Sequence, residues 1–162
     1  MERPYVMIAR EDYMKSSKIL EERIRRVKVL FKELAYRTFG DERSEGSFAA
    51  AFDNEAGRHG GFFIDRDSRF VEIGYSFQFS AAMNEYLKDR LEEMLTICYE
   101  FGCYTNIQNS ESEITFSLFS KIYFSGLNYA ALKDSLRDFH RCVELTTELM
   151  DIEKGSVETV DD

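Results

Sequence analysis

Two histidines and three cysteines are the side chains of this sequence best suited to metal binding or nucleophilic chemistry. A zinc site needs several such ligands brought together at short spacings. His59 lies beside two glycines and His140 lies in a long helical pattern, so no spacing joins them. Cys98, Cys103 and Cys142 are an odd number in no metal-ligand spacing, which favours buried, reduced thiols. We therefore expect no metal and no cofactor.

Asp65 and Asp67 form a D-x-D pair, a pattern that holds a divalent cation in some enzymes. A calcium loop would continue with another ligand, a glycine and a distant glutamate. The following residues 68–70 do not supply that pattern. Aspartate is common in tight turns because its side chain bonds the backbone, so we predict a turn here.

No phosphate-binding or nucleophile motif accompanies these residues. The glycine-rich segment 57–61 is followed by a strand pattern, so the helix N-terminus that would bind phosphate is missing. The G-x-S-x-G elbow is also absent. A catalytic triad could still assemble from distant residues. We nevertheless predict that the chain is not an enzyme, and an unrecognised active site is the alternative.

Composition narrows the class of partner. The chain has 162 residues, 44% of them hydrophobic, with a formal net charge of −9 and a pI near 4.9. An acidic surface disfavours nucleic acid and anionic lipid, because both carry negative charge. No apolar stretch is long enough to span a membrane, and the N-terminal apolar run is too short for a signal peptide. We expect a cytoplasmic protein.

The hydrophobic periodicity predicts helices and strands in the order α-β-β-β-α-β-β-α. A helix is predicted over residues 11–39, ended by a left-handed Gly40 and followed by a loop over residues 41–46. Alternating patterns predict about five strands, and Ser80 and Asn128 are suited to cap the two later helices. Tight turns between the strands require antiparallel pairing. The expected fold is a two-layer α+β sandwich, with one face of the sheet packed by helices.

This order divides the chain into three parts: an N-terminal arm over residues 1–10, a single α+β domain over residues 11–154, and an acidic flexible tail over residues 155–162.

Two segments carry a family resemblance over roughly residues 60–150. The strand pattern of Phe70–Phe77 leads straight into a helix, and Ile114–Phe119 leads into Leu127–Tyr129 and the last helix. With its size and acidity, the chain resembles the type III secretion chaperone-like fold, which also includes the YbjN family. The resemblance implies no catalytic residues. It implies a dimeric or partner-binding protein with a chaperone or regulatory role.

Four aromatic residues break the alternation of their strands. Phe63, Phe70, Phe119 and Tyr123 have the parity opposite to the main apolar set, so they are expected on the face away from the helices. An exposed aromatic patch usually marks an interface. The alternative is that residues 1–10 or the first helix fold over this face.

A basic cluster lies in the first predicted helix of this acidic protein. Arg23, Arg25 and Arg26, with the neighbouring Lys28, could receive an acidic segment of a partner. The alternative is structural: the same cations pair at helical spacing with three glutamates, Glu21, Glu22 and Glu33.

These expectations favour a non-catalytic protein-binding module, chaperone-like or adaptor-like. A client segment would lie in an apolar groove or add to a free strand edge. The partner is another protein or peptide segment, and a homodimer is expected. The alternative is a regulator of the YbjN type that acts through a stable complex.

Overall fold

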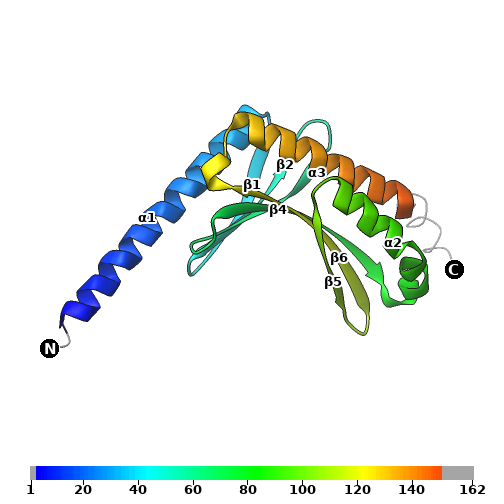
Figure 1. Cartoon of the computed structure of the whole chain (residues 1–162), viewed down its shortest axis with the longest axis horizontal. Coiled ribbons are helices and arrows are strands. Elements are labelled where there is room, and N and C mark those ends of the chain that lie inside the picture. Colours follow the sequence, from blue (N-terminus) through cyan, green and yellow to red (C-terminus); the bar gives the residue numbers. More distant parts are fainter. Residues whose placement is uncertain (1–2, 151–162) are drawn as a thin grey trace. The chain divides into compact units, whose positions relative to one another are not determined.

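The computed structural model describes the backbone of residues 3–150 and the side chains of residues 17–150. It has the predicted α+β architecture, an antiparallel sheet packed by helices (Figure 1). The helices are α1 (Arg3–Glu33), α2 (Asn84–Glu100) and α3 (Tyr129–Met150). The strands are β1 (Arg37–Ser44), β2 (Ser47–Asp53), β3 (His59–Asp65), β4 (Phe70–Ser80), β5 (Tyr104–Asn109) and β6 (Glu113–Tyr123). Their order in the sheet is β1-β2-β3-β4-β6-β5.

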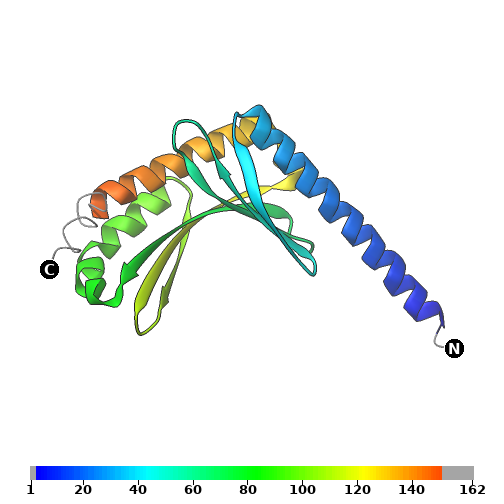
Figure 2. The same cartoon turned by 180° about the vertical axis from the view of Figure 1, so that it is seen from behind.

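The chain divides into two compact units, described separately below. Unit 1 comprises Met1–Ile73 with Lys121–Leu132, and unit 2 comprises Gly74–Ser120 with Lys133–Asp162. Residues 3–10 of the predicted arm belong to α1, whose N-terminal half continues past the strands of unit 1 (Figures 1 and 2). The predicted tail, residues 155–162, lies outside the described residues.

In unit 1 the second half of α1 packs on one face of β1–β3. The Phe31 ring stacks on Phe52 and Phe62, with ring centroids 4.7 and 5.1 Å apart. The apolar stripe expected on this helix forms the contact: its buried members are Leu20, Ile24, Val27 and Phe31. Burial of this stripe is the main stabilising term here, at roughly 1.5–3 kcal/mol for each large side chain.

The predicted loop over residues 41–46 is wrong, because β1 pairs there with β2. Ser44 lies opposite Ser47 across a hairpin, and the register shifts between Phe39 and Glu42. Gly40 does adopt a left-handed conformation, with φ 68°, but it serves this bulge in the strand and does not end a helix. The sheet therefore has one strand more than the pattern predicts.

Helix α1 ends earlier than predicted, in a motif that places an alanine where glycine is usual. The Tyr36 N–H donates to the Phe31 carbonyl at 2.9 Å, and the Ala35 N–H donates to the Lys32 carbonyl at 3.0 Å. This is the Schellman arrangement, whose left-handed position is occupied by Ala35 at φ 64°. An L-residue with a Cβ is strained in that conformation.

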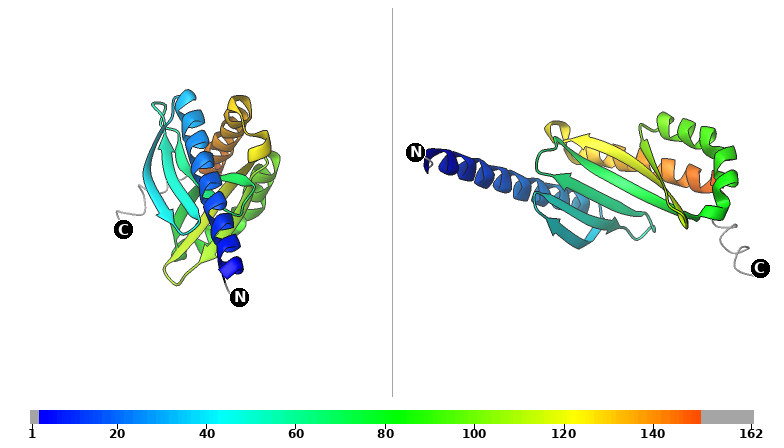
Figure 3. Two further views of the ribbon diagram at one scale, coloured as in Figure 1. Left: turned by 90° about the vertical axis from the view of Figure 1, so that its left-hand side faces the viewer. Right: turned by 90° about the horizontal axis from the view of Figure 1, so that it is seen from below.

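In unit 2, α2 and α3 pack together beside β4–β6 (Figure 3). The Tyr86 hydroxyl of α2 donates to the Met150 carbonyl of α3 at 2.8 Å. The Ser80 side chain accepts from the Ala82 N–H, which caps a short 3₁₀ turn before α2. After α2, Gly102 takes the left-handed conformation that stops the helix, with φ 68°.

Candidate interaction surfaces

The face of unit 1 opposite α1 carries four aromatic side chains, Phe39, Phe63, Phe70 and Tyr123, which we call the open face. Tyr123 is 57% exposed, Phe39 and Phe63 are each 41% exposed, and Phe70 is half-buried. The Phe70 and Tyr123 rings meet edge to face with centroids 5.8 Å apart. The Ser68 N–H donates to the Asp65 carbonyl and closes the turn between β3 and β4. The residues before and after this turn pair in order, so Phe63 of β3 lies opposite Phe70 of β4.

Small residues make the open face shallow between its aromatics. Ala51 of β2 lies opposite Phe39 on one side and Gly61 on the other, and Ala49 lies opposite Phe63. Because these residues have little or no side chain, a partner can approach the sheet closely there. A contiguous apolar surface of this kind usually marks a contact with another macromolecule.

An ion pair lies at one margin of the open face. Arg37 donates to both carboxylate oxygens of Asp53, at 3.1 and 2.7 Å. This hydrogen bonding lowers the pKa of the Asp53 carboxyl below its ordinary value. The Lys121 ammonium lies 4.5 Å from the centre of the Phe70 ring.

The described part of α1 does not cover the open face, contrary to the alternative raised from the sequence. Its buried side chains contact Phe52 and Phe62, which point to the other face of their strands. In the view from below, the strands of unit 1 lie in front of the C-terminal part of α1 (Figure 3, right). Residues 3–10 continue the same helix.

Phe119, the fourth aromatic predicted at a partner surface, belongs to unit 2 and has a local packing partner. Its ring stacks on Tyr104 with centroids 5.1 Å apart. It also covers Gly74, where an added Cβ would lie 3.1 Å from the ring. Phe39, in contrast, is an open-face residue that sequence analysis missed, because it was assigned to the first helix.

Two of the predicted basic residues hold unit 1 together by bonding backbone carbonyls. Arg23 donates to the Ser68 carbonyl at 2.9 Å, and its guanidinium lies 4.4 Å from the centre of the Phe124 ring. Arg26 donates to the carbonyls of Phe124 and Leu127. Both arginines thus bond α1 to segments far along the chain, so they have a structural role.

Arg25 differs from its neighbours. Its side chain is exposed and makes no hydrogen bond or ion pair with the side chains and backbone described here. Of the three arginines predicted at a partner surface, it is the one with its charge available in this part of the structure.

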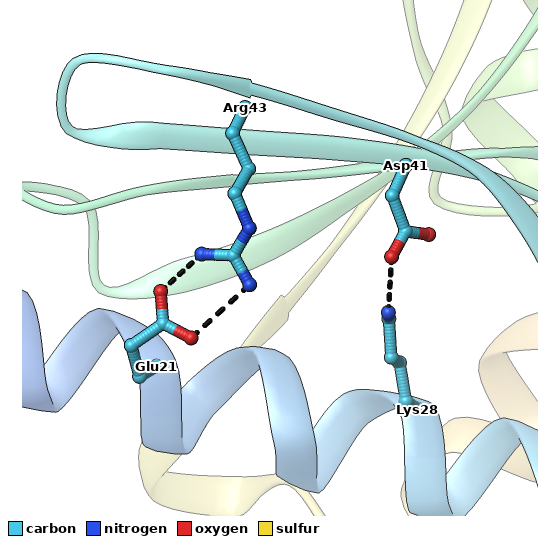
Figure 4. A network of polar contacts seen from close by, with 4 residues as sticks. All are labelled: Glu21, Lys28, Asp41 and Arg43. Atoms are coloured by element: carbon cyan, nitrogen blue, oxygen red, sulfur yellow. Dashed lines mark hydrogen bonds and ion pairs between the residues drawn. The ribbon is translucent and has the colours of Figure 1, made fainter.

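Two charged residues of α1 form ion pairs with β1, and these pairs are not at helical spacing. Lys28 pairs with Asp41, and Arg43 forms a bidentate ion pair with Glu21 (Figure 4). Exposed pairs of this kind contribute little individually, because solvent screens them. They also place charges along the outer edge of β1, which opposes pairing with another strand there.

The other edge of the sheet, β5 in unit 2, lies beside an apolar groove of about 190 Å³. Its apolar walls come from α2 and the β5–β6 hairpin: Leu87, Leu91, Met94, Ile107, Ile114 and Phe116. The polar residues Asn84, Lys88 and Asn109 complete the lining of the groove. As the last strand in the order, β5 has no strand partner among residues 3–150 for its outer backbone groups.

The two histidines belong to different units. His59 is exposed, with Nδ1 3.1 Å from the Gly57 carbonyl, whereas His140 is 4% exposed and packs edge-on against Phe139. Within residues 17–150, no group of three or more histidine, cysteine or acidic side chains is placed to hold a metal ion. No helix in the described range is long and apolar enough to cross a membrane.

Comparison with known proteins supports the fold. No family model matches the sequence, and no curated protein matches it. A solved structure, that of an uncharacterized protein from Methanothermobacter thermautotrophicus, is similar with a TM-score of 0.64 and 13% sequence identity. The similarity covers 78% of this chain and 95% of that chain. At this identity the likeness shows the fold alone.

Proposed function

We propose that this chain is a non-catalytic, cytoplasmic protein-binding module, chaperone-like or adaptor-like. The observation that carries the proposal is the open face of unit 1. Three aromatic side chains there are between 41% and 57% exposed, beside alanines and a glycine that leave the backbone accessible. Burying aromatic surface is the main source of affinity in most protein interfaces.

The partner is another protein, a peptide segment or a second copy of the chain. The Asp53 carboxylate at the margin of the open face is neutralised by Arg37, which favours a contact there although the chain carries a net charge of −9. A client segment could also pair with the outer edge of β5, where backbone groups have no strand partner in the described part of the chain.

A second candidate is a regulator of the YbjN type that acts within one stable complex. The resemblance over residues 60–150 favours it, and the open face would serve it equally well. A chaperone releases its client, so the two proposals differ in the lifetime of the complex.

The test uses two exposed tyrosines as a matched pair. Tyr123→Ser changes the open face, and Tyr99→Ser changes a residue of α2 that is 86% exposed and lies in unit 2. Light scattering measures self-association, and pull-down with the tagged protein measures partner capture. We expect Tyr123→Ser and Phe63→Ser to weaken either contact about tenfold or more, which corresponds to at least 1.4 kcal/mol.

Tyr99→Ser should leave both measurements unchanged. If Tyr123→Ser and Phe63→Ser also leave them unchanged while circular dichroism shows intact folding, the open face is not the binding surface. A chain that stays monomeric and captures nothing would contradict the binding-module proposal itself.

A further inference from the structure

The three cysteines of the chain, which are far apart in the sequence, meet at one buried place in unit 2. Cys98 lies in the last turn of α2, Cys103 immediately precedes β5, and Cys142 lies in α3. They are 1%, 7% and 0% exposed. The sulfurs of Cys142 and Cys98 are 3.7 Å apart. Three elements thus bring together every thiol of the protein.

The thiols are not equivalent. The contacts of Cys142 with Cys103 and Cys98 favour its thiolate form and lower its pKa. The same contacts, together with burial, raise the pKa values of Cys98 and Cys103. Cys142 is therefore the first of the three to lose its proton, and the thiolate is the form that reacts with oxidants.

A polar group lies beside the sulfurs. Thr146 follows Cys142 by one helical turn and is 0% exposed. Its side chain favours the charged form of Cys142 and also that of Cys98. The Thr146 hydroxyl can donate to a thiolate, or to the oxygen of an oxidised sulfur.

We propose that Cys142 and Cys98 form a peroxide-sensitive thiol pair that closes a disulfide between α3 and α2. The Cys142 thiolate attacks hydrogen peroxide, forms an S–O bond as the O–O bond breaks, and leaves a sulfenic acid and hydroxide. The sulfur of Cys98 then attacks the sulfenic sulfur. The S–S bond forms, the S–O bond breaks, and the oxygen leaves as water. In total, two thiols and one peroxide give one disulfide and two waters.

The movement that this needs is small. A disulfide has an S–S length of about 2.05 Å, so the two sulfurs must approach by about 1.7 Å. Local opening at the end of α2 would admit a molecule as small as peroxide. Met94 lies one turn before Cys98 and lines the apolar groove, so the disulfide would fix the helix face beside that groove.

The experiment treats the purified, folded protein with hydrogen peroxide, then alkylates the remaining thiols in denaturant and measures the intact mass. We expect alkylation to fall from three thiols to one, with a peptide that links Cys98 to Cys142. Cys103→Ser should retain this link, whereas Cys142→Ser and Cys98→Ser should lose it. Thr146→Val, which keeps the side-chain shape, should slow the reaction severalfold.

Three alkylated thiols after treatment, under conditions that oxidise the urea-unfolded chain, would overturn the proposal. A link formed through Cys103 at the same yield in Cys142→Ser would also overturn it. The mass measurement does not depend on any partner. A result that contradicts the disulfide would therefore not contradict the proposed binding function.

Discussion

Arg23, Arg25 and Arg26 lie within one turn of α1 and provide a sharp test of how this helix is held. Arg23 and Arg26 donate to backbone carbonyls of other segments of unit 1, and Arg25 makes no polar contact with described residues. We therefore expect Arg23→Ala and Arg26→Ala to destabilise the protein and Arg25→Ala to have little effect. All three changes remove the same charge, so the net charge cannot explain a difference.

The expected magnitude follows from the contacts. A hydrogen bond from a charged donor contributes about 1.5–3 kcal/mol, and a cation over an aromatic ring contributes about 0.5–1 kcal/mol at an exposed site. Arg23 makes one of each but is partly exposed, which places its loss at about 2 kcal/mol. Arg26 is more exposed, so we expect about 1 kcal/mol. Arg25→Ala should stay within about 0.5 kcal/mol.

Urea unfolding followed by circular dichroism measures these differences, because the chain has no tryptophan for fluorescence. A lower midpoint with an unchanged slope reports a change in the free energy of unfolding. Arg23→Lys is a useful further variant, since lysine keeps the charge but lacks the planar guanidinium. Equal losses for Arg25→Ala and Arg23→Ala would refute the anchoring role, and so would an unchanged midpoint for Arg23→Ala.

Three further predictions concern backbone strain, packing and charge. Ala35→Gly should raise the free energy of unfolding by about 0.5–1 kcal/mol, because glycine relieves the left-handed strain at φ 64°; a lower urea midpoint would contradict this. Gly74→Ala should cost about 1 kcal/mol, because its Cβ would lie 3.1 Å from the Phe119 ring, and a double-mutant cycle with Phe119→Ala should show coupling between the two. By NMR titration, the pKa of Asp53 should lie below its ordinary value and return upward in Arg37→Ala. Because the pKa is lower in the folded state, the stabilisation is present above the unfolded-state pKa and is lost as pH falls through the folded-state value.

The parts of the fold that the sequence predicts are those set by local pattern. The stripe of Leu20, Ile24, Val27 and Phe31 identifies the buried face of α1, and strict alternation identifies β4. Caps are equally local: the Ser80 and Asn128 side chains accept from N–H groups two and three residues ahead. These features depend on residues within one or two turns of each other.

What the pattern misses depends on distant residues. Segment 37–44 contains one large apolar side chain and four charged ones, so its pattern predicts the end of a helix followed by a loop, yet it becomes β1 by pairing with β2. The roles of Arg23 and Arg26 depend on carbonyls that carry no side-chain signal. The sequence pattern does not predict the thiol cluster for the same reason, because 44 residues separate Cys98 from Cys142.

Unit 1 is made of two segments that are far apart in the chain, so it can be completed only after the second segment has been synthesised. Arg26 is made 98 and 101 residues before the two carbonyls to which it donates. At about 5–20 residues per second, that delay is roughly 5–20 s. All of unit 2 up to Ser120 emerges in between. A nascent chain that has not reached Leu127 therefore has Arg26 without its full set of carbonyl partners, and unit 1 is completed late over a long loop.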